Sequence, residues 1–316
     1  MGHFMPLDLV PGADARKTEE PYPDSSMIIG HAWSLRMRSI TRTFLIPFVF
    51  LFTQMPKASA IDIITTFRGG SPPANAAGAG NLVDIFNAAA HVWEQAYRDS
   101  FTVRLYFGWA PLDSAGNHTL VEQGGVPNRE TVGIILFDNS GKRSFYLDPT
   151  PLQNEEYQRL TEESEDLGGG YVNVARVFRQ PAGDAAGHID LFSVALHEIG
   201  HALGMCGVNP SFAKESRYGS IGIVGELPYA GTIIPLSLNF SGVTPHFDAN
   251  RLAYGSVMAG IGGDERRIPS ALEILANAQI SGFQEINLNL HQVTTPAALP
   301  VLRPVGRSHA GSAGNE

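Results

Sequence analysis

The stretch His197-Glu198-Ile199-Gly200-His201 is the most informative part of this sequence, because it places two imidazoles one helical turn apart with a carboxylate beside the first. In an α-helix, residues i and i+4 lie on one face with Cβ atoms about 5–6 Å apart, so both rings can bind one metal ion. Glu198 projects roughly 100° round the helix from His197. This position beside the metal suits a general base acting on zinc-bound water, so the stretch predicts a zinc site for hydrolysis.

The flanking residues predict that this stretch lies on a helix with one buried face. Asp190 is a suitable N-cap, and Gly204 and Gly207 are suitable places for the helix to end. Gly200 lies inside the helix, where glycine is about 1 kcal/mol less favourable than alanine, so we expect another part of the protein to pack closely against it. The apolar residues at helical spacing are Leu191, Val194, Ala195, Ile199 and Leu203.

A catalytic zinc site normally has three protein ligands and one open position, so the motif requires a third ligand. Besides the motif pair and two histidines in the first 60 residues, the candidates are His91, His118, His188, His246, His291 and His309. A glutamate from a downstream helix, as in thermolysin-like enzymes, is an alternative, and Glu215 and Glu226 are available although both lie near residues that break helices. Cys206 follows the motif and can reach zinc in principle, but a small buried thiol is the alternative interpretation.

The eight residues that end at Gly204 have the pattern HExxHxxG and resemble the metzincin metalloproteases, in which the glycine turns the chain towards a third histidine. The residue three places after Gly204 is Gly207, so the usual short form is interrupted. A more distant histidine, His246, followed by a methionine turn at Met258, resembles the layout of leishmanolysin and its bacterial relatives. The resemblance covers about residues 185–282.

This resemblance implies a zincin/metzincin-like α+β fold. A mixed N-terminal β-sheet would pack on two helices, one of which carries the metal ligands, and a smaller C-terminal subdomain would contain the methionine turn and a helix. The resemblance also implies one catalytic Zn²⁺ bound by three histidines, a glutamate as the general base, and a methionine and a glycine as structural support. In this sequence those residues are His197, His201, His246, Glu198, Met258 and Gly204.

The rest of the sequence predicts further helices and strands around the motif. Asn81 is expected to cap a helix that runs to about Arg98, and Pro269-Ser270 to open another that continues through Ala278. Strands are expected at 61–67, 101–107, 131–137 and 171–178, a polar turn at 262–267, and an insertion of short strands and loops that wall the cleft at 207–245.

Three regions are expected along the chain. The first 60 residues predict a leader with a secretory signal peptide, residues 61–290 a catalytic domain, and residues 291–316 a disordered tail. The polar segment before the signal is out of place, so the true start of the protein is expected at Met27 or Met37, with a genuine leader as the alternative.

The signal peptide is predicted from three features in order. An apolar run from Phe44 to Phe52 follows a basic segment and precedes Ala58-Ser59-Ala60, which is a cleavage site of the A-x-A type. The run has about half of the roughly 20 residues needed to span a membrane, so a cleaved signal is favoured over an anchor. The basic residues are Arg36, Arg38 and Arg42.

Charge limits the classes of partner. Without the first 60 residues the chain keeps 16 basic and 26 acidic residues, so it is acidic and has no basic stripe for nucleic acid or anionic membranes. A single cysteine excludes an internal disulfide. The acidic run 161–166 favours a solvated surface over a calcium site, because its spacing matches no EF-hand loop.

These features predict a secreted zinc-dependent endopeptidase, extracellular or periplasmic, that acts on a protein or peptide substrate. Tyr254 is a candidate for stabilising the oxyanion, with a packed aromatic side chain as the alternative. The competing hypothesis is a non-catalytic cell-surface or matrix-binding protein with a structural or vestigial zinc site, which the missing ligand at Gly207 favours. Glu198 favours the enzyme, because a purely structural site has no need of a base that does not bind the metal.

Overall fold

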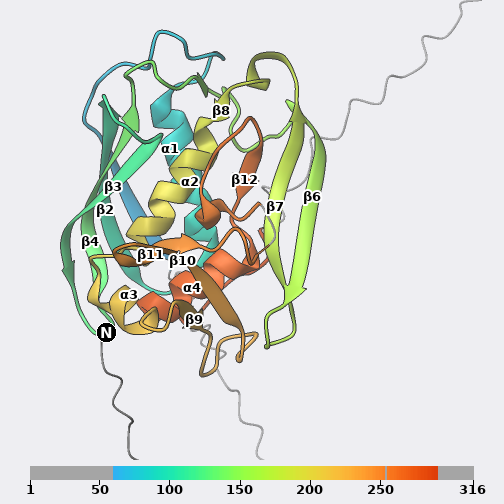
Figure 1. Cartoon of the computed structure of the whole chain (residues 1–316). Coiled ribbons are helices and arrows are strands. Elements are labelled where there is room, and N and C mark those ends of the chain that lie inside the picture. Colours follow the sequence, from blue (N-terminus) through green and yellow to red (C-terminus); the bar gives the residue numbers. More distant parts are fainter. Residues whose placement is uncertain (1–59, 253–254, 291–316) are drawn as a thin grey trace, which may run out of the picture. The chain divides into compact units, whose positions relative to one another are not determined.

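The structure is a computed structural model and describes residues 60–252 and 255–290 (Figure 1). The predicted leader and signal peptide, except for Ala60, lie outside the described residues, as do the predicted tail at 291–316 and Tyr254. In the described part of the chain, no helix is both long and apolar enough to cross a membrane.

The N-terminal half forms a four-stranded mixed sheet in the order β1-β2-β4-β3. β1 (Ile61–Phe67), β2 (Phe101–Ala110) and β4 (Arg129–Asp138) are parallel, and they contain the apolar and β-branched runs that predict strands. β3 (Gly116–Gly124) pairs antiparallel with β4 at the edge of the sheet. The sequence does not predict β3, because most of its residues are polar and its conformation depends on pairing with β4.

Two helices pack beside each other and against this sheet (Figure 1). α1 (Leu82–Ala96) is capped by Asn81, whose side chain accepts a hydrogen bond from the Asp84 N–H. It ends slightly before the predicted Arg98, because Tyr97 is extended and bridges to Ile286. α2 (Leu191–Ala202) carries the motif, and Trp93 Nε1 of α1 donates a hydrogen bond of 3.0 Å to the Leu196 carbonyl of α2.

On the other side of α2 lies a long hairpin of β6 (Tyr157–Asp166) and β7 (Tyr171–Pro181), joined by β12 (Arg266–Ile268) (Figure 1). The acidic run 161–166 is part of β6, where exposed and half-buried residues alternate. It is therefore a strand with a solvated face. The shorter elements between β4 and α2 in the chain are β5 (Phe145–Tyr146), η1 (Gly183–Ala185) and β8 (Ile189–Asp190), and β5 pairs in parallel with β8.

The prediction of a polar turn at 262–267 is wrong for its last two residues, because Arg266 and Arg267 are buried in β12. The Arg266 guanidinium donates hydrogen bonds to the buried carboxylates of Asp148 and Asp190. Asp190 also accepts a hydrogen bond of 3.0 Å from the Ser193 N–H, and so caps α2 as predicted. The buried ion pairs thus connect β12 to the start of the motif helix.

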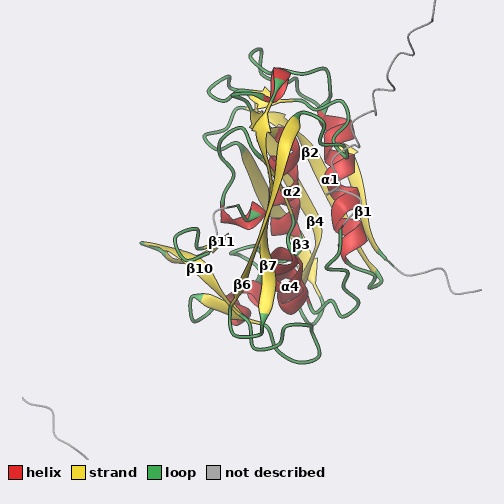
Figure 2. Ribbon diagram, turned by 90° about the vertical axis from the view of Figure 1, so that its right-hand side faces the viewer, coloured by secondary structure: helices red, strands yellow, loops and turns green. Residues whose placement is uncertain are grey.

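The predicted insertion at 207–245 contains one short helix as well as strands. α3 (Pro210–Glu215) begins with proline in its first turn after the capping residue Asn209, a signal that the sequence interpretation missed. β9 (Ser220–Gly222), β10 (Ile233–Asn239) and β11 (Gly242–Phe247) form a small antiparallel sheet. Figure 2 shows the β10–β11 hairpin projecting sideways from the rest of the described residues.

The C-terminal part contains η2 (Val257–Ala259), a single turn of 3₁₀-helix, and α4 (Ala271–Ser281). Ser270 and Glu273 form a capping box at the start of α4, which confirms the predicted helix start. Glu273 also accepts a hydrogen bond of 2.5 Å from Ser256, the residue that caps η2. The turn that contains Met258 is therefore held against α4.

Candidate metal centre

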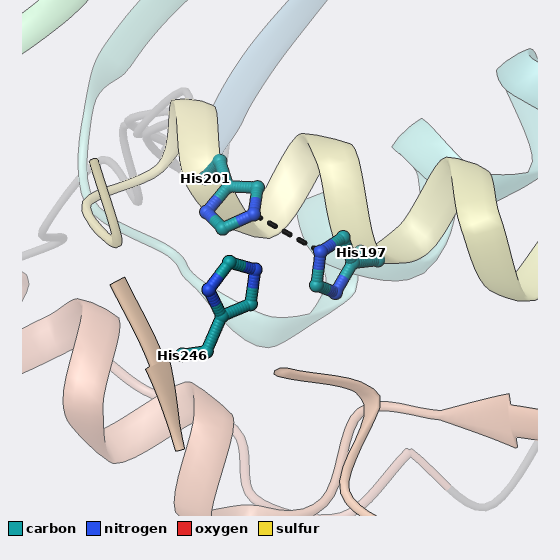
Figure 3. A group of neighbouring side chains, drawn as sticks. All are labelled: His197, His201 and His246. Carbon is teal, nitrogen blue, oxygen red and sulfur yellow. Dashed lines mark hydrogen bonds between the residues drawn. The ribbon is translucent and has the colours of Figure 1, made fainter. Parts of the chain in front are cut away.

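Three histidines from two elements meet in one place (Figure 3). His197 and His201 project from α2, and His246 projects towards them from β11. The ring centroids are 4.5 Å apart for His197 and His201, and the His246 centroid lies 5.2 Å and 5.0 Å from them, respectively. One ring nitrogen from each histidine lies within 4.8 Å of the others, so the three could bind a single metal ion.

The hydrogen bonds of the two motif histidines determine which nitrogen carries the proton. Nδ1 of His197 donates to the Val257 carbonyl at 2.8 Å, and Nδ1 of His201 donates to the Met205 carbonyl. Because a carbonyl only accepts, both Nδ1 atoms carry the proton, and in the neutral rings both Nε2 atoms carry lone pairs. These two Nε2 atoms face each other at 3.0 Å. Two lone pairs repel each other at this distance. A cation bound by both nitrogens would remove this repulsion, because each lone pair would then form a bond to the metal.

Burial favours the neutral, metal-binding form of each ring. Burial, reinforced by the nearby His246, lowers the pKa of His197 to about 3. The pKa of His201 is held well below its usual range by burial and by the adjacent His197. Burial also lowers the pKa of His246. All three rings are therefore neutral at neutral pH and fit a zinc ion, which takes neutral imidazole ligands.

Met258 lies directly against α2 and is fully buried. A Cβ atom built on Gly200 would lie 2.6 Å from the Met258 sulfur. Gly200 thus provides the space that Met258 occupies, which confirms the expectation that something packs closely there. Gly204 likewise allows α4 to pack closely, because a Cβ at this position would lie 2.9 Å from Asn277 Oδ1 of α4.

We expect Gly200→Ala to destabilise the protein. Overpacking in a core lowers the free energy of unfolding by about 1–3 kcal/mol. The better helix propensity of alanine offsets only about 1 kcal/mol of this loss. Urea unfolding should therefore give a lower free energy of unfolding. Gly207→Ala is the control, because the nearest atom to a Cβ at that position is 3.8 Å away. Equal stability of both variants, or a full effect of Gly200→Ala in a Met258→Ala background, would contradict this explanation.

Glu198 is buried beside the motif histidines, between α2 and the edge strand β3. Its carboxylate lies over Gly116, where a Cβ would come within 2.5 Å of Oε1. Burial raises the pKa of the Glu198 carboxyl to about 7, against the lowering effects of the His118 charge and of a hydrogen bond with the His118 backbone. A carboxyl group with this pKa can both accept and release a proton near neutral pH.

The raised pKa of Glu198 predicts a pH effect in the metal-free protein. Its pKa of about 7 exceeds the ordinary value of 4.5, so the folded state keeps a proton that the unfolded state has already released. As pH rises from 4.5 to 7, the chelated wild type should lose up to about 3 kcal/mol of stability relative to Glu198→Gln. Urea unfolding of both proteins across this range measures the difference. A difference that stays constant with pH would contradict the assignment.

The three histidines and Glu198 line a cleft of about 770 Å³. The opposite wall is formed by Ser114 to Leu120, which lead into and form the first half of β3. Neither Glu215 nor Glu226 is among the described residues that line this cleft. Glu215 ends α3, where it accepts hydrogen bonds from Lys214 and Gln279, so the structure does not bring the two alternative glutamates to the histidines.

The remaining histidines lie elsewhere or outside the described residues. His91 is exposed on α1, and His188 is also on the surface. His291 and His309 are not described.

His118 instead forms a second group with Glu130 and Cys206, and two of its members, His118 and Cys206, line the same cleft. Burial lowers the pKa of His118, but hydrogen bonds to Cys206 and Glu130 outweigh this effect and raise it to about 9. The sequence interpretation considered His118 and Cys206 one at a time and did not consider Glu130. No local spacing connects the three, because they lie on β3, on β4 and after α2.

Comparisons with protein-family models, with curated proteins and with solved structures found no match for this chain.

Proposed function

We propose that this protein is a zinc-dependent endopeptidase of the metzincin type, with a layout that resembles leishmanolysin. The observation that carries the proposal is the pair of unprotonated Nε2 atoms of His197 and His201, which face each other at 3.0 Å. His246 completes a set of three imidazoles. Each motif histidine uses its Nδ1 proton on a backbone carbonyl, the arrangement that fixes the tautomer and orientation of histidine ligands.

Zinc bound by His197, His201 and His246 would supply Lewis-acid chemistry, by polarising a substrate carbonyl and lowering the pKa of water. Glu198 would accept the proton of the attacking water and pass it to the leaving amine. Its burial and its place beside the histidines support this role. Because the carboxylate lies between α2 and β3, it is held next to any substrate that occupies the cleft.

The edge strand β3 supports a peptide substrate. Among the described strands β3 pairs only with β4, so its other edge is free to pair with an extended chain. Its first residues line the cleft opposite the histidines. Addition of a strand to a sheet edge is a common way to bind an extended peptide. A peptide paired with β3 would run past Glu198, which lies over Gly116.

Metal removal tests the proposal. The purified protein should contain zinc and cleave an unfolded protein substrate. A chelator should abolish cleavage, and added zinc should restore it, because the proposed ligands remain in place. Retention of zinc without any hydrolysis would instead favour the non-catalytic surface or matrix-binding protein.

Export by the predicted signal peptide is part of the same proposal. N-terminal sequencing of the exported protein should therefore give a sequence that begins at Ile61.

A further inference from the structure

A second group of metal-ligand side chains lies beside the three histidines. His118 comes from β3, Glu130 from β4, and Cys206 from the segment after α2. One ligand atom from each lies within 4.8 Å of the others. The group shares no residue with the candidate metal centre, although the rings of His118 and His201 stack with centroids 6.2 Å apart.

The Glu130 carboxylate is buried with incomplete hydrogen bonding. The side chains of His118 and Glu130 are only 4% and 1% exposed, and His118 Nε2 lies 2.9 Å from Glu130 Oε1. The other oxygen, Oε2, is buried and has no hydrogen-bond partner among the described residues. A buried polar atom without a partner costs about 1–3 kcal/mol, and more when the group is charged. Native structures keep few such atoms, and a bound ion is one explanation for them.

The neighbouring backbone makes room for this carboxylate. A Cβ atom on Gly133 of β4 would overlap Glu130 Oε1. Any other residue at position 133 would therefore push the carboxylate away from His118. This group combines a buried carboxylate, a glycine that accommodates it, an imidazole and a thiol. Together these features indicate a ligand site and not an incidental cluster of buried polar residues.

We propose that His118, Glu130 and Cys206 bind a second zinc ion. Thiolate, imidazole and carboxylate together suit zinc, whereas calcium and magnesium take oxygen ligands. On binding, the Cys206 thiol and the protonated His118 ring each release a proton to solvent, and the sulfur and the ring nitrogen form the metal bonds. His118 and Cys206 line the cleft, so the fourth position of the ion would be open to water or substrate. The ion would tie the edge strand to the segment after α2 and fix the width of the cleft.

Cobalt substitution of the full chain tests this inference without any measurement of activity. Loaded with Co²⁺, the wild type should bind about two ions and show a thiolate-to-cobalt charge-transfer absorption in the near ultraviolet. The three-histidine centre contains no sulfur, so this absorption reports only on Cys206. Cys206→Ser should lose the absorption and one ion. His246→Ala should lose one ion and keep the absorption, which separates failure of the second site from failure of the proposed catalytic centre.

Two further variants guard against unfolding as an explanation. Glu130→Gln keeps the shape of the side chain and should weaken cobalt binding at the second site at least tenfold. Glu122→Gln changes an exposed carboxylate on β3, the strand that carries His118, and this matched control should leave cobalt binding unchanged. Circular dichroism confirms that each variant is folded. A wild type without the absorption, or a folded Cys206→Ser that binds as many ions as the wild type, would overturn the proposal in favour of a hydrogen-bonded cluster without metal.

Discussion

Replacement of Glu198 by glutamine should leave the zinc content unchanged and lower kcat by about 10²–10⁴-fold, the usual contribution of a general base. Glutamine has nearly the same shape, so it should still fit over Gly116 between α2 and β3. It cannot accept a proton from water, so the attack on the peptide bond loses its base. The measurement is single-turnover cleavage of an unfolded protein, together with the metal content of each preparation.

Glu226→Gln is the control for this experiment, because Glu226 is exposed in a turn and does not line the cleft. It should retain wild-type activity and zinc. Full activity of Glu198→Gln would contradict the proposed mechanism. Loss of zinc from Glu198→Gln would show instead that Glu198 is a ligand and that the metal site has been assigned incorrectly.

Loss of the His246 imidazole should weaken zinc binding about as much as loss of the His201 imidazole, because each would supply one of the three proposed ligands. A ligand that binds only the folded state stabilises it by roughly 4 kcal/mol at a thousandfold excess over Kd. In saturating zinc, the Tm of His246→Ala should therefore fall towards that of the metal-free wild type. Zinc titration and thermal unfolding at fixed zinc concentration measure the two effects.

His91→Ala and His188→Ala are matched controls on the surface and should keep wild-type zinc affinity and Tm. Glu215→Ala and Glu226→Ala test the alternative third ligand. If either glutamate variant lost zinc and activity while His246→Ala kept both, the protein would belong with the glutamate-ligand zinc peptidases. The comparison with leishmanolysin would then fail.

Local sequence signals predicted several of the elements that carry the site. The spacing of the motif histidines, the Asp190 cap and the apolar stripe predicted α2, and Ser270 predicted the start of α4. Gly200 indicated a close neighbour without identifying Met258. These inferences succeed because capping and helical periodicity depend on residues within one or two turns of each other.

Signals that depend on distant partners were missed or misread. β3 has a polar sequence and becomes a strand by pairing with β4. Arg266 was expected in a polar turn, yet it is buried because Asp148 and Asp190 neutralise it from positions far away in the chain. No local sequence pattern predicts such pairings, because burial of a charged group is favourable only after the fold has brought its partners together.

The sequence by itself determined that His197 and His201 share one helix face with Glu198 beside them, since four residues of an α-helix make little more than one turn. It offered several candidates for the third ligand, and His246 was preferred on resemblance alone. Only the tertiary structure placed His246, 45 residues beyond His201, against the motif helix. It alone turned two Nε2 atoms towards each other and joined His118, Glu130 and Cys206. Those contacts depend on how β3, β4 and β11 pack around α2, which no local spacing encodes.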